Sequence, residues 1–195
     1  MFTVITNLKD RHIFFVVSLL AFFLLFIVFP FTMVGGDEGR FVQDALRIGR
    51  GDIPIADYGT RAPILSYVIY SFTEIFGRSL FIFRLPVLIF SALTTGFIFL
   101  LGKELFSRTI GILAAILFAS VPFTLWFHAV IKSEALEMLL VTAAARFLTR
   151  GLQDNKPRLF IYSGICMGFA FIERQSAAAF MLASAFIVMG DAFRK

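Results

Sequence analysis

The sequence predicts an all-α fold, a polytopic bundle of transmembrane helices with amphipathic interfacial helices in its first extracytoplasmic loop. Three observations predict it. First, 59% of the 195 residues are hydrophobic and only 16% are charged, which is far more apolar than an ordinary soluble domain. Second, the apolar residues gather into several long runs. Third, the basic residues lie in short clusters between these runs, as expected of loops at a membrane surface.

About six spans are expected from these runs. The first, residues 13–34, contains no charged residue and is long enough to cross a hydrocarbon core of about 30 Å. Five further runs follow at residues 80–101, 110–127, 135–148, 159–172 and 176–189. The last three are short for a full crossing unless their flanking polar side chains reach the membrane surface.

The basic clusters predict the topology. Cytoplasmic loops carry an excess of lysine and arginine, so we expect both termini in the cytoplasm and the loop at residues 35–79 outside it. Because the clusters do not form one basic stripe, the formal net charge of +5 does not indicate nucleic-acid binding. The residues concerned are Lys9, Arg11, Lys103, Arg108, Arg150, Lys156, Arg158, Arg194 and Lys195.

The first loop, residues 35–79, is predicted to hold two helices. Apolar residues recur at helical spacing between residues 41 and 48, where Asp37 is placed to cap the helix and Gly49 to end it. A second stretch begins at Pro63 and ends at Gly77. With about 14 residues, it is more typical of an interfacial or re-entrant helix than of a span.

The same loop carries the first candidate chemistry. Asp37 and Glu38 could deprotonate an acceptor hydroxyl or hold a divalent cation, although acidic residues at a helix start are also favoured by capping and by the helix dipole. Arg61, close to Tyr58 and just before the helix that begins at Pro63, could bind a phosphate together with the backbone N–H groups of that helix. The alternative for Arg61 is contact with lipid headgroups.

A second group of candidates lies on the same predicted side. Lys132 and Glu134 precede the fourth span and supply a cation and an acid, or alternatively only a favourable helix start. His128 is a packing histidine or a substrate contact. Arg84 and the Glu173-Arg174 pair fall at outer ends of spans, where a charged side chain can reach the surface. Together these residues predict a polar site over a hydrophobic groove. Cys166, the one cysteine, permits neither a disulfide framework nor a cysteine-based metal site.

Several short motifs in order resemble the GT-C glycosyltransferases of the protein mannosyltransferase and aminoarabinose transferase type. The resemblance runs from the first span to about Arg174. It is carried by Gly36-Asp37-Glu38, Arg47-Ile48-Gly49-Arg50-Gly51, Asp57-Tyr58-Gly59-Thr60-Arg61-Ala62-Pro63, Phe76-Gly77, Arg84-Leu85-Pro86, Leu101-Gly102-Lys103-Glu104-Leu105-Phe106 and Lys132-Ser133-Glu134.

The resemblance implies inverting transfer of a sugar from a polyprenyl-phosphate donor to an acceptor at the outer face of a bacterial or archaeal plasma membrane. The acceptor could be a protein, a lipid or a glycan. Asp37 would be the general base with Glu38 beside it, and Glu134 a further catalytic acid. Asp37 and Glu134 would be the ligands of any divalent metal ion. The residues expected to bind the donor are Tyr58, Arg61, Arg84, His128, Lys132 and Arg174.

Residues 1–195 are expected to form one module that corresponds to the N-terminal part of this pattern. A C-terminal half or a second chain would then complete the donor site. The alternative reading is a different class of protein, a lipid-binding or transport subunit without catalysis, in which the first loop only anchors at the membrane surface.

Overall fold

The computed structural model describes residues 9–29, 35–60 and 62–193, and within these ranges the chain is helical with no strand. The all-α prediction is therefore confirmed for the described residues. The helices are α2 (Asp10–Ile27), α3 (Gly36–Ile48), α4 (Pro63–Phe76), α5 (Leu80–Leu105), α6 (Arg108–Ser120), α7 (Pro122–Ala129), α8 (Glu134–Asp154), α9 (Pro157–Glu173) and α10 (Ala178–Ala192), with a 3₁₀ turn η1 (Gln175–Ala177).

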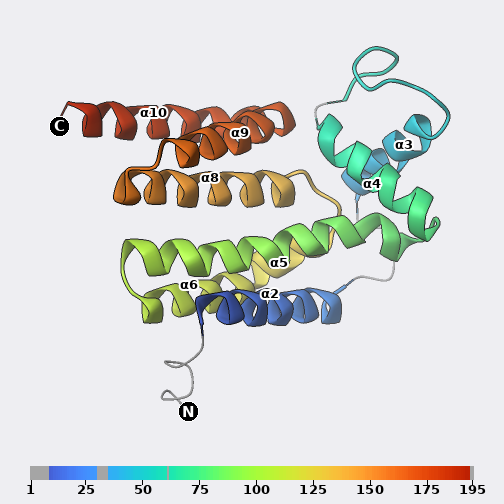
Figure 1. Cartoon of the computed structure of the whole chain (residues 1–195). Helices are drawn as coiled ribbons and strands as arrows, with labels where there is room; N and C mark the ends of the chain where they lie inside the picture. The colour runs from blue at the N-terminus through green and yellow to red at the C-terminus, as the bar shows by residue number, and fades with distance from the viewer. Residues whose placement is uncertain (1–8, 30–34, 61, 194–195) are drawn as a thin grey trace.

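The long helices lie side by side and run back and forth between two ends of a bundle (Figure 1). Helix α5 is central, because it packs against α2, α6 and α8, and α8 in turn packs against α9. Helices α3 and α4 come between α2 and α5 in the sequence, and they lie together at one end of the bundle. The start of α2 and the end of α10 lie at the other end.

Two described helices, α2 and α5, are long and apolar enough to cross a membrane, and α6 with α7 makes a third if the pair is counted as one span. The protein is thus an integral membrane protein. Helices α9 and α10, with 17 and 15 residues, are shorter than a full crossing requires, and α8 carries charged residues at both ends. The count of six spans therefore stays a prediction.

The predicted span at residues 110–127 is not straight. It divides into α6 and α7, which meet at an angle of 65°. The cause is Pro122, which has no N–H to continue the hydrogen-bond ladder and forces Val121 into an extended conformation with φ −65° and ψ 123°. The bend brings the end of α7 back toward α5.

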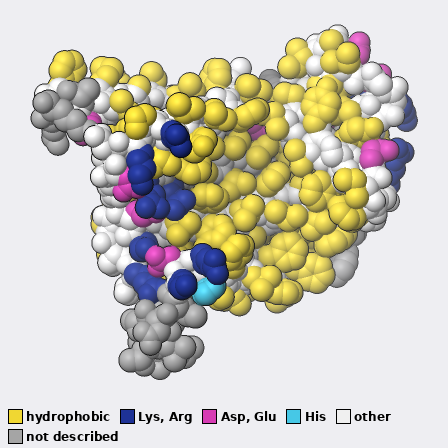
Figure 2. All heavy atoms as spheres, in the orientation of Figure 1, with side chains coloured by type: hydrophobic (Ala, Val, Ile, Leu, Met, Phe, Trp, Pro, Cys, Tyr) yellow, Lys and Arg dark blue, Asp and Glu magenta, His cyan; other side chains and the backbone are white. Residues whose placement is uncertain are grey.

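The surface divides into a broad apolar band and charged ends (Figure 2). Large hydrophobic side chains stand exposed along the long helices, among them Phe15, Leu19 and Phe23 of α2 and Phe186 of α10. Such exposure is costly in water and is favourable in lipid. In the view of Figure 2, the left-hand end of the bundle carries the densest group of lysine and arginine side chains.

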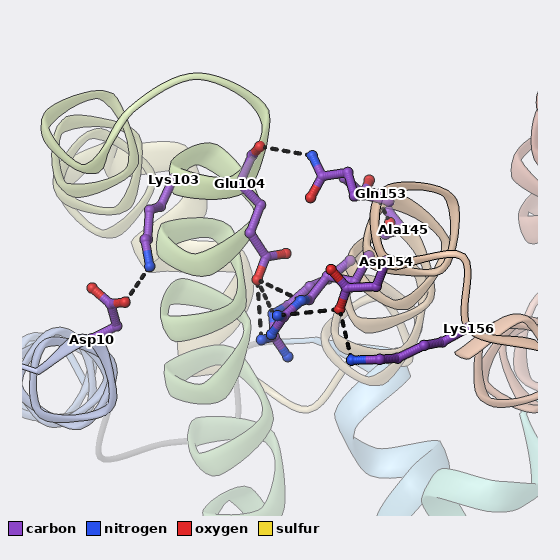
Figure 3. Close-up of polar contacts among 10 residues, drawn as sticks. Asp10, Lys103, Glu104, Ala145, Gln153, Asp154 and Lys156 are labelled. Carbon is purple, nitrogen blue, oxygen red and sulfur yellow. Dashed lines mark hydrogen bonds and ion pairs between the residues drawn. The ribbon is translucent and has the colours of Figure 1, made fainter. Parts of the chain in front are cut away.

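A polar network ties the helices together at that basic end (Figure 3). Lys103 of α5 bonds to Asp10 of α2. The Glu104 carboxylate accepts hydrogen bonds from the guanidinium group of Arg146 in α8, with an N···O distance of 3.1 Å, and Gln153 donates to the Glu104 carbonyl at 3.1 Å. Three helices are thereby fixed at the end that the sequence predicts to be cytoplasmic.

Helices α5 and α6 approach each other closely through small residues. A Cβ atom placed on Gly111 would lie 2.4 Å from the carbonyl oxygen of Phe99 and 2.8 Å from the backbone nitrogen of Lys103. Only glycine fits such a contact, and small residues have this role at many helix interfaces in membranes.

Helices occupy both stretches of the first loop that the sequence marks as helical, and their location at a membrane interface stays a prediction. Helix α3 ends at Gly49, and α4 begins at Pro63 and ends at Gly77, whose φ of 88° favours glycine. The predicted capping role of Asp37 is wrong. Gly35 is the N-cap residue of α3, and Asp37 lies in the first turn without a capping hydrogen bond.

The inner sides of α3 and α4 join the hydrophobic core of the bundle. Ala45 of α3 and Leu65 and Ile69 of α4 pack in one buried cluster with Val87 of α5 and Ile131 before α8. One face of each helix is thus buried in the core, and the first turns of α3 present Asp37, Arg40 and Phe41 to a polar cavity.

Candidate functional site

A polar cavity of about 180 Å³ lies at the end of the bundle where α3 and α4 sit. Four segments that are far apart in the sequence form it: the first turns of α3, the residues just before α4, the residues at the start of α8, and the residue after α9. The lining residues are Asp37, Arg40, Phe41, Thr60, Ala62, Lys132, Ser133, Glu134 and Arg174. The structure therefore brings together Asp37, Lys132, Glu134 and Arg174 of the predicted site residues.

Asp37 and Glu38 point in different directions because successive residues of an α-helix are rotated by about 100° about its axis. Asp37 is exposed and lines the cavity. Its carboxylate makes no hydrogen bond or ion pair with the other described residues. Glu38 is only 2% exposed and faces the bundle. Of the acidic pair that the sequence analysis proposed, only Asp37 can reach a molecule in the cavity.

The Glu38 carboxylate is held by Arg84 of α5 in a two-point ion pair. Arg84 Nε donates to Glu38 Oε1 at 2.7 Å and a terminal guanidinium nitrogen donates to Oε2 at 2.6 Å. The backbone N–H of Ile131 also donates to Oε1, at 2.9 Å. The expectation that Arg84 reaches the membrane surface is wrong, because its side chain is fully buried against Glu38. Neither Arg84 nor Glu38 lines the cavity.

The loop between α3 and α4 is fixed by Asp44, a buried residue of α3. Thr60 donates its hydroxyl hydrogen to Asp44 Oδ2 at 3.0 Å, and Ser66 donates to the same oxygen at 3.5 Å. Tyr58 donates to the Asp44 carbonyl at 3.3 Å and lies under the Arg47 guanidinium. Burial raises the pKa of the Tyr58 phenol. Tyr58 thus supports the loop and does not line the cavity, contrary to the donor contact expected of it.

Arg61 lies outside the described residues, between Thr60 and Ala62, both of which line the cavity. The expectation that the start of α4 offers free N–H groups to a phosphate is not supported. Glu173 Oε2 accepts hydrogen bonds from the N–H groups of Ile64 and Leu65, at 3.1 and 3.2 Å. An anion of the protein therefore already occupies this helix N-terminus.

Glu173 is in the sequence analysis only a charged residue at the outer end of a span, and it is not among the predicted site residues. It directly follows the run at residues 159–172 and is fully buried. Burial raises the pKa of its carboxyl group from the ordinary 4.5 to about 7, against the lowering effect of the two backbone hydrogen bonds and of Arg174. A carboxylate next to an arginine at the end of an apolar run was the available signal, although the sequence does not show its partner on α4.

Arg174 joins the cavity to the start of α8. Its guanidinium group pairs with Glu134 and with Glu137, each at 3.0 Å, and donates to the Ser133 hydroxyl at 3.1 Å. Arg40 of α3 donates to the Gly59 carbonyl at 3.4 Å. The Lys132 ammonium group lies over the Phe127 ring, 4.0 Å from its centre.

Two cations of the cavity can bind an anionic ligand. The cavity is lined by three cations, Arg40, Lys132 and Arg174, and two anions, Asp37 and Glu134. Arg174 is already paired with Glu134 and Glu137, whereas Arg40 and Lys132 make no ion pair with another described residue. A phosphate group would thus meet donors on two sides of the cavity and one carboxylate, Asp37, free to accept a proton from a hydroxyl group.

A divalent metal ion would find two carboxylates here, Asp37 and Glu134. The described part of the chain holds no group of three or more histidine, cysteine, aspartate or glutamate side chains placed to bind a metal ion. Two carboxylates are sufficient only for an ion such as Mg²⁺ that takes its other ligands from water or phosphate oxygens. The metal stays a prediction.

His128 is not brought to the cavity. It is buried in the bundle, 4% exposed, where its Nδ1 lies 2.7 Å from the Ser91 hydroxyl. Its ring packs edge-on against Phe118, with ring centres 5.6 Å apart. This placement corresponds to the packing histidine that the sequence analysis gave as one of two alternatives, and the contact with substrate is not supported.

Comparison with known proteins gave one match. A family model described as dolichyl-phosphate-mannose-protein mannosyltransferase matches residues 60–195. The matched region contains the cavity residues from Thr60 to Arg174 and begins after α3, which carries Asp37. No curated protein and no solved structure matches the chain.

Proposed function

Because the chain belongs to the dolichyl-phosphate-mannose-protein mannosyltransferase family of GT-C membrane glycosyltransferases, we propose that it transfers a sugar from a polyprenyl-phosphate donor to an acceptor hydroxyl. The observation that carries the proposal is the cavity itself, where Asp37 of the first loop meets Lys132, Glu134 and Arg174. The sequence predicts all four as site residues, and they come from segments far apart in the chain.

The proposed reaction is a single displacement at the anomeric carbon. The acceptor oxygen forms a bond to that carbon while the bond from the carbon to the phosphate oxygen breaks. Asp37 takes the proton of the acceptor hydroxyl, and the electron pair of the broken bond leaves with the phosphate. Lys132 and Arg174 stabilise the negative charge of the departing polyprenyl phosphate, together with Arg61.

Glu134 has a supporting role in this proposal. Its carboxylate pairs with Arg174 at 3.0 Å and so holds the guanidinium group at the cavity edge. A guanidinium group that is oriented before the donor binds loses less side-chain freedom on binding. A divalent ion held by Asp37 and Glu134 is a further part of the proposal, and would help to neutralise the donor phosphate.

We propose the topology with six spans and with the cavity on the extracytoplasmic side. Two features support it. When α6 and α7 are counted as one bent span, the spans from α5 to α10 alternate in direction between the two ends of the bundle (Figure 1). The densest basic cluster visible in Figure 2 lies at the end away from α3 and α4.

The test is transfer of radiolabelled mannose from dolichyl-phosphate mannose, measured with the purified chain in proteoliposomes and with the chain in native membranes. Transfer that depends on Asp37 supports the enzyme. Activity in native membranes alone shows that the chain needs a partner or an acceptor found there. Donor binding without transfer under both conditions would favour the alternative, a lipid-binding or transport subunit.

A further inference from the structure

We propose that Glu173 is a positioning residue for this transfer, because it fixes the start of α4 and with it the cavity wall formed by Thr60 and Ala62. This inference rests on the proposed function and deepens it. Glu173 does not line the cavity and acts on the donor site only through the segment that it holds.

The contact is a direct one between distant parts of the chain. One oxygen of the buried Glu173 carboxylate accepts hydrogen bonds from the N–H groups of Ile64 and Leu65, at 3.1 and 3.2 Å. The first N–H groups of a helix have no partner within the helix, so these bonds satisfy them. The other oxygen, Oε1, is buried and has no hydrogen-bond partner among the described residues.

The segment before α4 is therefore anchored at both of its ends. Asp44 of α3 holds Thr60 through a hydrogen bond of 3.0 Å. Glu173 holds the first turn of α4, immediately after Ala62 and Pro63. Arg61, the expected donor ligand, lies in the sequence between these two anchors. Loss of either anchor would release a wall of the cavity.

The turn after α9 also supplies a residue that lines the cavity, Arg174. Arg174 follows Glu173 and is held there by Glu134 and Glu137. Glu173 contacts the start of α4, and the adjacent Arg174 contacts the start of α8. The two residues thus hold these two parts of the cavity at a fixed distance from each other.

The experiment compares Glu173→Ala and Glu173→Gln with the parent chain, using dolichyl-phosphate mannose as the donor in proteoliposomes or native membranes. Glu173→Ala removes the acceptor of both hydrogen bonds, and we expect the donor KM to rise about tenfold because the cavity wall is no longer held, with a smaller change in kcat. Glu173→Gln keeps an acceptor oxygen and should restore the KM to within about twofold of the parent value. Glu74→Gln, at an exposed carboxylate near the other end of α4, is the matched control.

A second readout needs no catalysis. Ala62→Cys, in a chain whose native Cys166 is replaced by alanine, places a thiol at a position that is 5% exposed. We expect Glu173→Ala to speed its alkylation by a polar maleimide about tenfold, and Glu173→Gln to leave the rate near that of the parent.

The outcomes separate the two proposals. An unchanged donor KM and an unchanged alkylation rate in Glu173→Ala would overturn the positioning role. Faster alkylation in a chain that neither binds nor transfers the donor would keep the anchor and reject the proposed function. A kcat loss with unchanged donor KM in both variants would also contradict the inference, since it would place Glu173 in the chemical step.

Discussion

The Arg84 guanidinium and the Glu38 carboxylate form a buried ion pair with two hydrogen bonds, of 2.7 and 2.6 Å. This pair joins the first turn of α3 to the second turn of α5. It also determines the direction of Asp37, because the residue before Glu38 on the helix must then face away from the bundle. The orientation of the proposed base thus depends on a contact outside the cavity.

Removal of one partner of this pair should destabilise the protein strongly. Arg84→Met leaves the Glu38 carboxylate buried without its cation, and we expect a loss of about 3–5 kcal/mol in the free energy of unfolding. The double variant Glu38→Leu with Arg84→Met removes both charges and should recover most of that loss. Thermal unfolding in detergent measures both effects.

The matched control is Arg78→Met, because Arg78 forms an exposed ion pair with Glu74 at 3.4 Å. Its loss should cost less than about 1 kcal/mol. An equal loss of stability in Arg78→Met and Arg84→Met would show that the ion pair between Arg84 and Glu38 does not stabilise the contact between α3 and α5.

Asp37→Asn should remove transfer and keep donor binding. Asparagine is nearly isosteric with aspartate but cannot take a proton from the acceptor, so we expect kcat to fall by about 10²-fold or more. The measurement is transfer from dolichyl-phosphate mannose together with equilibrium binding of the same donor. Asp52→Asn, at the half-exposed partner of Arg47 beyond the end of α3, is the control and should leave kcat within about twofold.

Arg174→Lys should weaken donor binding although it keeps the positive charge. Lysine cannot bond Glu134 and Glu137 at once through a planar fork, as the guanidinium group does at 3.0 Å to each. We expect the donor Kd to rise about tenfold, a loss of about 1.4 kcal/mol. Arg158→Lys, at the basic end of the bundle, should have no effect on the same measurement.

The stability of the protein should depend on pH through Glu173. Because the pKa of this carboxyl group is raised from 4.5 to about 7 in the folded chain, its protonated form favours folding. Its contribution is full below pH 4.5 and is lost as the pH rises to about 7. Glu173→Gln removes this titration, so its melting temperature should fall less than that of the parent between pH 5 and pH 8. Identical slopes would contradict the assignment.

Alanine substitutions at two glycines should have different effects on the stability of the protein. Gly111→Ala places a methyl group 2.4 Å from the Phe99 carbonyl oxygen and should destabilise the protein by about 1–3 kcal/mol. Gly164→Ala, on α9 with nothing within 4 Å of the added atom, should be neutral or stabilising by up to about 1 kcal/mol. Thermal unfolding of the two variants compares them directly.

Much of the helical arrangement could be predicted because its causes are local. Glycines end α3 and α4, proline begins α4, and long apolar runs mark α2 and α5. The bend between α6 and α7 was not predicted. The apolar composition of residues 110–127 predicts one continuous span, whereas Pro122 within it lacks an N–H and bends the helix. The capping role of Asp37 was wrong because Gly35, two residues earlier, is the N-cap residue of the helix.

The site was predicted only in part because proximity depends on contacts between distant segments. Asp37, Lys132, Glu134 and Arg174 were selected by charge and position, and all four line the cavity. Charge alone could not show that Glu38 is buried in the bundle while Asp37 lines the cavity. That outcome depends on Arg84, 46 residues after Glu38. Likewise, the contact of Glu173 with α4 spans 108 residues and leaves no local pattern.

During synthesis, the turn that carries Glu173 and Arg174 is made after the other segments that form the cavity. A ribosome delivers α3 and α4 to the membrane long before it delivers the end of α9, since chains emerge from their N-terminus. Until that turn arrives, the start of α4 lacks its anchor and Glu134 lacks its arginine. The nascent chain therefore lacks these contacts of the cavity wall until α9 and the turn after it are inserted.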